Sequence, residues 1–162
     1  MVTLKIISGG QTGADQGALV GAKEAGFETG GTAPAGYKTE NGYERALLMS
    51  YGLDEHQSPY YKERTYKNVK DAYLTVWIGK QDSPGFACTM NAVRECHRVA
   101  FKFSKNWTEE DVDLVAAFIG GYGDMHTVVV NFAGNRESTN PGIHESTKNF
   151  VLALKRNLNG KE

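Results

Sequence analysis

The chain has 162 residues, of which 40% are hydrophobic and 23% charged, and its formal net charge at pH 7 is -1. This composition indicates a single globular domain over residues 1–162 and excludes a disordered chain. Lysine and arginine form no stripe, so we expect no nucleic-acid partner. No apolar stretch is long enough to cross a bilayer and no signal peptide is evident, so we expect a cytoplasmic protein without a membrane partner.

The predicted elements alternate between strands and helices. A β-branched run over 2–8 predicts a strand that stops at two glycines, and small apolar residues over 14–25 predict a helix with Gly26 as its C-cap. A brief strand over 27–29 and a long loop over 30–42 follow, because the latter is rich in glycine, proline and threonine. Farther along, we expect helices over 44–50, 60–70, 87–99 and 142–158, strands over 73–78, 100–103 and 127–132, and a helix starting at Thr108, where Asp111 completes a capping pattern.

This order of elements predicts the fold class. Nearly continuous apolar strands that alternate with helices are typical of a parallel sheet covered on both faces. We therefore expect an α/β protein, a three-layer Rossmann-like domain with a mostly parallel sheet. Ligands of such sheets bind in the crevice outside the carboxyl ends of the strands.

The turn after the first strand carries the strongest local signal, and it reads SGGQTGAD over residues 8–15. Two glycines permit a tight turn and a helix begins at once, so we expect its first backbone amides to point unpaired toward the ligand edge. A phosphate suits that geometry, although a glycine-rich turn can also serve only to pack a strand against a helix. The turn matches neither the Walker loop nor GxGxxG.

Two later strand ends have a similar composition. Gly85 and Thr89 follow the strand over 73–78, and Gly134 and Arg136 follow the strand over 127–132. The planar guanidinium of Arg136 suits a phosphate, and the alternative is a solvated loop arginine. For Thr89, the alternative to ligand contact is a simple helix cap.

These turns also carry a resemblance to a known family. The segments SGGQTGADQGAL, TGGTAPAGYKTENG, RTYKNV and NFAGNRESTNPGI are similar, in the same order, to the motifs of the "putative molybdenum cofactor carrier" family of the SLOG superfamily. That superfamily also contains YpsA-like proteins and the LOG phosphoribohydrolases. The resemblance spans nearly the whole chain and implies a Rossmann-like fold, a nucleotide-type or pterin-phosphate ligand, and a homodimer or homotetramer.

The resemblance also implies ligand-binding positions. It places Gly9, Gly10, Gln11, Thr12, Gly13 and Asp15 in the first ligand loop, Gly31, Pro34 and Glu40 in a lid-like second loop, Arg64 and Asn68 on the following helix, and Arg136 in the last loop.

The chain departs from the family pattern before its central helix. Residues 83–89 read SPGFACT, where the family usually has a Gly-Gly-Thr turn, so Phe86 and Cys88 add bulk where bare backbone would meet the ligand. This departure leaves the identity of the ligand open. Asn135 stands where a proline is common, and the PGGxGTxxE signature of the LOG enzymes is absent.

Several residues have a structural reading beside the functional one. Arg64 and Asn68 share one helix face, so they either meet the ligand or make structural hydrogen bonds. Cys88 is expected at a helix N-terminus that lowers the pKa of its thiol, or else as a small packing residue. Asp15, Glu40 and Glu137 are candidates for the carboxylate of a glycosidic hydrolase, and no spacing singles one out.

The histidines and cysteines have no metal-ligand spacing, so we expect no metal site built by the protein, and any molybdenum would arrive inside its pterin cofactor. The chain is therefore expected to bind a phosphorylated small molecule, either the molybdenum cofactor (molybdopterin) or another nucleotide-like ligand, without an assigned catalytic residue. The alternatives are sequestration or sensing of a nucleotide-derived signal such as an ADP-ribose derivative, a nucleotide phosphoribohydrolase-type enzyme, and a scaffold that kept only the fold.

Overall fold

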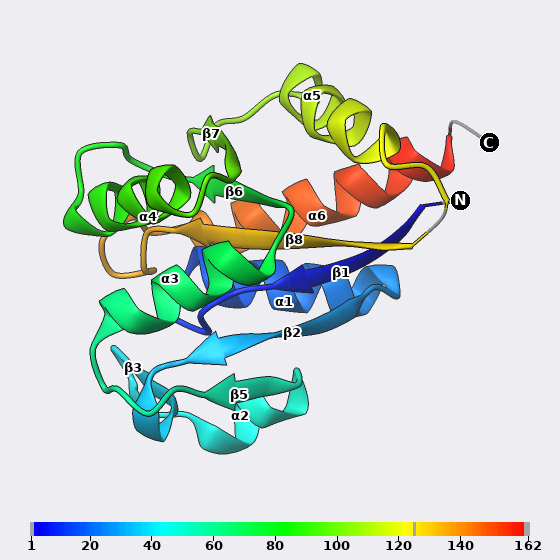
Figure 1. Cartoon of the computed structure of the whole chain (residues 1–162). Helices are drawn as coiled ribbons and strands as arrows, with labels where there is room; N and C mark the ends of the chain where they lie inside the picture. The colour runs from blue at the N-terminus through cyan, green and yellow to red at the C-terminus, as the bar shows by residue number, and fades with distance from the viewer. Residues whose placement is uncertain (1, 125, 161–162) are drawn as a thin grey trace.

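A computed structural model describes residues 2–124 and 126–160 of the chain. Its main sheet has six parallel strands in the order β5-β2-β1-β8-β6-β7 (Figure 1). The strands are β1 (Thr3–Ile7), β2 (Glu28–Ala33), β5 (Leu53–Glu55), β6 (Leu74–Ile78), β7 (Val99–Phe103) and β8 (Thr127–Gly134). The helices are α1 (Ala14–Ala25), α2 (Arg45–Ser50), α3 (Tyr61–Asp71), α4 (Pro84–Glu95), α5 (Glu109–Gly120) and α6 (Ile143–Asn159). A 3-10 turn, η1 (Ala35–Tyr37), and a small hairpin of β3 (Lys38–Thr39) and β4 (Gly42–Tyr43) complete the described elements.

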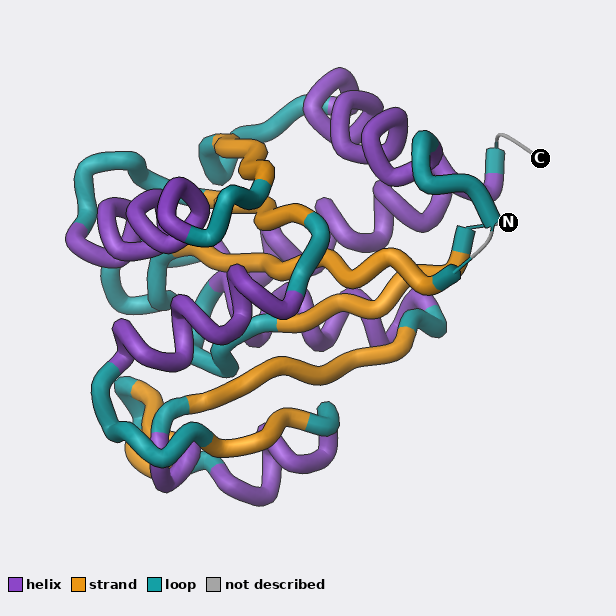
Figure 2. Tube along the Cα trace, viewed as in Figure 1, coloured by secondary structure: helices purple, strands orange, loops and turns teal. Residues whose placement is uncertain are grey.

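The helices cover both faces of the sheet. Helices α3 and α4 pack against each other on one face, in front of the sheet in Figure 1, and α1, α5 and α6 pack together on the other. The strand arrows of Figure 1 point to the edge where the longest loops gather, drawn in teal in Figure 2. The predicted three-layer, Rossmann-like α/β fold is therefore confirmed.

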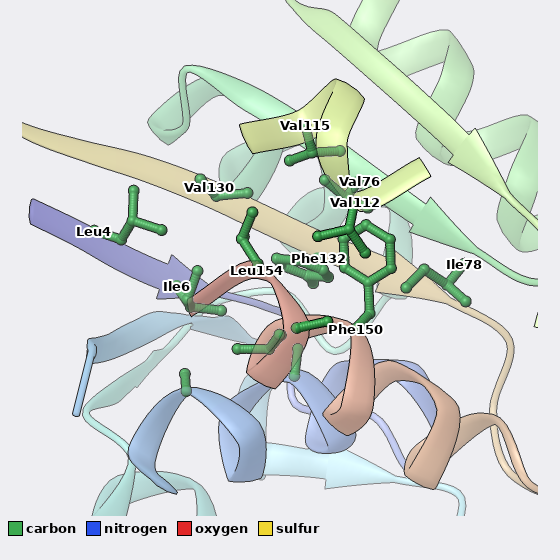
Figure 3. Close-up of a cluster of buried hydrophobic side chains, with 14 of the residues drawn as sticks. Leu4, Ile6, Val76, Ile78, Val112, Val115, Val130, Phe132, Phe150 and Leu154 are labelled. Carbon is green, nitrogen blue, oxygen red and sulfur yellow. The ribbon is translucent and has the colours of Figure 1, made fainter. Parts of the chain in front are cut away.

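The main core lies between the sheet and helices α1, α5 and α6. Ile6, Val76 and Phe132 project from three neighbouring strands and meet Phe150 and Leu154 of α6, and all five are fully buried (Figure 3). Full burial of one such side chain stabilises the fold by about 1.5–3 kcal/mol. The alternate residues of β6 and β8, Thr75, Trp77 and Asn131 among them, point to the face covered by α3 and α4, which is more polar.

Glycines in α1 explain how that helix lies so close to α6. A Cβ at Gly17 would stand 2.2 Å from the backbone oxygen of His144, and one at Gly21 would stand 2.7 Å from that of Lys148. Each glycine costs about 1 kcal/mol of intrinsic helix stability relative to alanine, so packing against α6 holds this helix together.

The segment between residues 30 and 55 differs most from the prediction. Instead of a loop over 30–42, β2 continues to Ala33, and it is followed by η1 and the hairpin of β3 and β4. Strand β5, which was not predicted, pairs with the end of β2 through Gly31 and Leu53. Neighbouring strands, rather than local propensity, extend the glycine-rich segment.

Helix boundaries follow their caps. The central helix begins at Pro84 rather than residue 87, because Ser83 caps it by accepting the Phe86 N–H at 3.1 Å and Pro84 has no N–H to leave unpaired. The predicted cap of α5 is confirmed, since the Thr108 N–H donates to Asp111 at 2.9 Å. Within the described residues, no helix is long and apolar enough to cross a membrane.

Candidate functional site

A cavity of about 470 Å³ opens at the carboxyl ends of β1, β6 and β8, between the sheet and helices α3 and α4. This volume lies within the range of small-molecule sites. Many predicted site residues line the cavity, namely Gly9, Gln11, Asp15, Arg64, Asn68, Gly85, Thr89, Gly134 and Arg136. The β8 strand lies between β1 and β6, so turns far apart in the sequence meet at one edge.

Three backbone amides at and before the start of α1 have partners within the protein, and at Ala14, the first residue of the helix, the prediction of an unpaired amide is wrong. The Ala14 N–H donates to the Asn135 carbonyl at 3.1 Å, and the Gln11 N–H donates to the Asp15 carboxylate at 3.2 Å. The Thr12 N–H donates to the side-chain oxygen of Gln11 at 3.0 Å. Because β8 lies next to β1 in the sheet, the loop after β8 reaches the start of α1 and accepts the hydrogen bond of Ala14.

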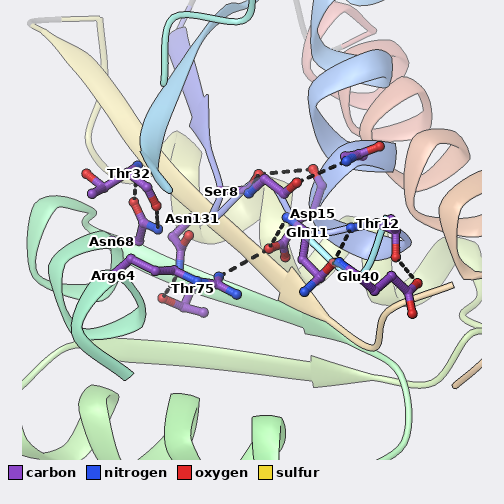
Figure 4. Close-up of polar contacts among 12 residues, drawn as sticks. Ser8, Gln11, Thr12, Asp15, Thr32, Glu40, Arg64, Asn68, Thr75 and Asn131 are labelled. Atoms are coloured by element: carbon purple, nitrogen blue, oxygen red, sulfur yellow. Dashed lines mark hydrogen bonds and ion pairs between the residues drawn. The ribbon is translucent and has the colours of Figure 1, made fainter. Parts of the chain in front are cut away.

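Asp15 and Arg64 form a buried ion pair across the cavity (Figure 4). Arg64 Nη1 donates to Asp15 Oδ2 at 3.2 Å, and the two side chains are only 12% and 5% exposed. Burial raises the pKa of Asp15 above its ordinary value, against the lowering effects of Arg64 and the Gln11 amide. Gly9 lets the guanidinium lie against the backbone, because a Cβ there would stand 1.7 Å from Arg64 Nη1. The carboxylate thus holds Arg64 in place.

Two donors of this group are buried and unused. Gln11 is 6% exposed, and its side-chain oxygen accepts the N–H groups of Thr12 at 3.0 Å and Glu40 at 2.8 Å, which settles the orientation of the amide. Its Nε2 then has no partner in the described part of the chain, and the same is true of Arg64 Nε. Because buried donors in proteins are nearly always paired, these two N–H groups mark a place for an acceptor.

Three cationic side chains lie around the ring of Tyr61 at the mouth of the cavity. The guanidinium groups of Arg64 and Arg136 lie 5.3 Å and 5.6 Å from the centre of its ring, and the Lys38 ammonium lies 6.0 Å from it. Such contacts are favourable, but the cations repel one another. Arg136 forms no direct ion pair with a carboxylate among the described residues, although its charge contributes to the lowered pKa of Glu40.

Other predicted site residues do not line this cavity: Gly10, Thr12, Gly13, Gly31, Pro34 and Glu40. Glu40 instead accepts hydrogen bonds from the hydroxyl groups of Thr12 and Ser138, and from the Ser138 N–H at 3.3 Å. Burial opposes ionisation, but these hydrogen bonds outweigh it and hold the pKa of Glu40 below its ordinary value. We call Thr12, Glu40 and Ser138 the clasp, because they join the first loop, the hairpin and the loop after β8.

The glycines outside the cavity have packing roles. Gly13 has a positive φ of 81°, and a Cβ there would stand 2.4 Å from the Asn135 carbonyl oxygen. Gly31 has a φ of 126°, and a Cβ there would stand 2.1 Å from the Ser8 carbonyl oxygen. Both positions therefore need glycine to join the loops to the sheet.

Asn68 lines the cavity but uses its amide on the backbone. Its Oδ1 accepts the Thr32 N–H and its Nδ2 donates to the Thr32 carbonyl, both at 2.9 Å. These two hydrogen bonds pair the backbone groups of Thr32, where β2 extends beyond the end of β1. The Asn68 amide thus makes structural hydrogen bonds, which is one of the two alternatives that the sequence left open.

The start of α4 forms one wall of the cavity. Thr89 is buried in the second turn and does not cap the helix, because Ser83 does so. Cys88 also lies in that second turn, and burial raises the pKa of its thiol, which contradicts the alternative of a lowered pKa and leaves that of a small packing residue. Phe86 packs edge-on against Trp77, with ring centres 5.2 Å apart.

Sequence reasoning missed two residues of the cavity floor, Trp77 on β6 and Asn131 on β8. Trp77 is 2% exposed and Asn131 is 3% exposed. The asparagine had a signal, because it interrupts the apolar run TVVVNF of a buried strand. Asn135 was noted only as a departure from the family, yet its Oδ1 accepts from the Lys80 N–H at 2.7 Å and from Asn140 Nδ2 at 3.1 Å. It ties the loop after β6 to the loop after β8.

The third candidate carboxylate also has a structural task. Glu137 accepts the N–H groups of Gly142 at 2.7 Å and His144 at 3.0 Å, which caps the start of α6. Together with the partners of Asp15 and Glu40, this leaves each candidate carboxylate hydrogen-bonded within the protein. The described residues contain no group of three or more His, Cys, Asp or Glu that could hold a metal ion.

The fold and this cavity define a Rossmann-like α/β protein with a polar site at the carboxyl edge of its sheet. The chain belongs to the circularly permutated YpsA SLOG family, whose model matches residues 6–155. Its structure is similar to a crystal structure named "Putative molybdenum carrier protein" from Syntrophus aciditrophicus SB, with a TM-score of 0.83 and 28% sequence identity. That similarity covers 94% of this chain and 95% of the other. A comparison with curated proteins found no match.

Proposed function

We propose that this protein binds a phosphate-bearing, nucleotide-like small molecule in the cavity beside Arg64 and Arg136. The observation that carries the proposal is the set of unused donors at one end of the cavity, the buried Gln11 Nε2 and Arg64 Nε. Arg136 adds a positive charge without a paired carboxylate among the described residues. Phosphate oxygens accept hydrogen bonds only, so they match a set of donors.

The specific candidate is the molybdenum cofactor, carried as cargo. Its support is the name of the similar crystal structure from Syntrophus aciditrophicus SB, together with the match between its phosphate and these donors. The proposed role is holding rather than turnover, because Asp15, Glu40 and Glu137 each accept hydrogen bonds within the protein.

A second candidate ligand is an ADP-ribose derivative. The observation that favours it is the pair of guanidinium groups that share the ring of Tyr61. Two neighbouring arginines suit a diphosphate, whose charge exceeds that of a single phosphate.

Calorimetric titration tests the proposal. We expect ribose 5-phosphate to bind and ribose not to bind. Arg136→Ala should weaken ribose 5-phosphate by about tenfold or more, because it removes charge-assisted hydrogen bonds. The control is Arg94→Ala, which removes an exposed arginine of α4 whose hydrogen bond goes to Asn91. Equal binding of ribose and ribose 5-phosphate, or no effect of Arg136→Ala, would contradict the proposal.

A further inference from the structure

The floor of the cavity differs chemically from its phosphate end. Val76 and Ile78 of β6, and Val130 and Phe132 of β8, belong to the apolar core. Because side chains alternate along a strand, Trp77 and Asn131 point to the opposite face, toward α3 and α4. The strands are neighbours, with Thr75 opposite Asn131 and Trp77 opposite Ala133, so these two floor residues lie close to each other.

Each floor residue has one buried polar atom without a partner. The indole Nε1 of Trp77 has no acceptor and the amide Oδ1 of Asn131 has no donor in the described part of the chain. Asn131 is held through its Nδ2, which donates to the Thr75 hydroxyl at 3.2 Å, while Trp77 is held by Phe86. Leaving a buried donor and a buried acceptor unpaired is unfavourable, and native proteins rarely do so away from a site that a ligand completes.

A ligand that pairs both atoms must offer one hydrogen-bond acceptor and one hydrogen-bond donor. A phosphate can accept from Trp77 but has no proton to offer to Asn131. A sugar hydroxyl can do both, but it is too small to use the surface that Trp77 and Cys88 contribute to the cavity. A fused nitrogen heterocycle has a donor and an acceptor side by side on its edge and a flat apolar face for such a surface.

We propose that Trp77 and Asn131 recognise the ring edge of a purine- or pterin-type heterocycle. Trp77 Nε1 donates to a ring acceptor, and Asn131 Oδ1 accepts from a neighbouring ring N–H or amino group. This inference rests on the proposed function and defines the chemistry of the part of the ligand that is not the phosphate. It also makes Trp77 and Asn131 specificity residues, while Arg64 and Arg136 bind the phosphate.

Titrations with GMP, AMP, neopterin monophosphate and ribose 5-phosphate separate the two halves. We expect at least one of the three heterocyclic phosphates to bind about tenfold more tightly than ribose 5-phosphate. Trp77→Phe and Asn131→Leu should each remove most of that preference and leave the affinity for ribose 5-phosphate nearly unchanged. The probe that gains most distinguishes a purine from a pterin.

The matched control is Thr147→Val, which removes a fully buried hydroxyl of α6 that does not line the cavity and has no hydrogen-bond partner among the described residues. It should keep the preference for the heterocycle. Trp77→Phe changes a large buried side chain and can disturb the fold. A second measurement, by fluorescence, therefore uses a variant that keeps both Trp77 and Asn131. In Trp107→Phe, Trp77 is the one remaining tryptophan of two, and its emission should change with the preferred heterocyclic phosphate but not with ribose 5-phosphate.

The outcomes distinguish the two proposals. If ribose 5-phosphate binds but no heterocycle adds affinity, or both floor variants weaken all probes equally, the inference is wrong and the proposed function stands. If the heterocyclic probes bind through the floor and Arg136→Ala changes nothing, the phosphate site is wrong instead. Failure of every probe to bind would overturn both.

Discussion

At the residue scale, the central feature is an arginine held against bare backbone. Asp15 fixes one end of the Arg64 guanidinium, and Gly9 leaves the space that it occupies. The remaining Nε is buried and has no hydrogen-bond partner in the part of the chain that the structure describes. A glycine in this first turn therefore serves a side chain from α3, which neither the spacing nor the composition of the turn could reveal.

The substitution Gly9→Ala tests this arrangement. The backbone at Gly9 does not have a positive φ, so alanine fits the local conformation, but its Cβ would stand 1.7 Å from Arg64 Nη1. The displaced guanidinium leaves the buried Asp15 carboxylate without its cation, so we expect the melting temperature to fall. The affinity for ribose 5-phosphate should fall about tenfold, because Arg64 leaves its position.

The control for this substitution is Gly26→Ala, at a C-cap where a Cβ would meet nothing within 4 Å. Its φ of 81° makes alanine strained, so this variant should lose stability and keep its affinity. Unchanged binding by Gly9→Ala would show that the position of Arg64 does not matter to the ligand.

At the element scale, the strands and helices with regular apolar patterns were predictable, α2 (Arg45–Ser50) among them, and the strands over 30–43 and 53–55 were not. Strand β2 is glycine-rich and gains its last residues by pairing with β5, which is only three residues long. Such pairing is a tertiary effect that local propensity does not encode. The start of α4 was misplaced for a different reason, since the Ser83-Pro84 cap was present in the sequence and was overlooked.

The clasp of Thr12, Glu40 and Ser138 gives an element-scale prediction. The pKa of Glu40 is lowered in the folded protein, so its stabilising effect is present above the ordinary value of 4.5 and is lost as pH falls through the folded-state value. At pH 7, Glu40→Gln should therefore reduce hydrogen-exchange protection over residues 38–44, where the hairpin lies.

This difference between Glu40→Gln and the wild type should shrink in acid, because the wild-type carboxyl then becomes neutral as well. The comparison uses protection factors corrected for intrinsic exchange rates at each pH. Glu28→Gln is the control, since Glu28 forms an exposed ion pair with Lys5, 3.6 Å apart, at the start of β2. A difference that stays constant down to acid pH would show that the charge of Glu40 does not hold the hairpin.

At the scale of the whole molecule, strand order decides which motifs meet. Strand β8 lies between β1 and β6, so the loop around Asn135 contacts both the first turn and the turn before α4. The sequence predicted three loops at one sheet edge but not their order, because crossover connections are not readable from periodicity. Trp77 and Asn131 were missed because a buried polar face of a parallel sheet is unusual, and the apolar runs around them dominated the pattern. The expected dimer or tetramer stays a prediction.

The most direct test of the central claim is mass spectrometry of the small molecule released when the protein purified from cells is denatured. We predict a phosphate-bearing compound with a fused nitrogen heterocycle, near one equivalent per chain, and its loss from Arg136→Ala but not from Arg94→Ala. A pterin phosphate with molybdenum would support carriage of that cofactor, and an ADP-ribose derivative would support the second candidate. A retained compound without phosphate, or equal retention by Arg136→Ala, would contradict the account.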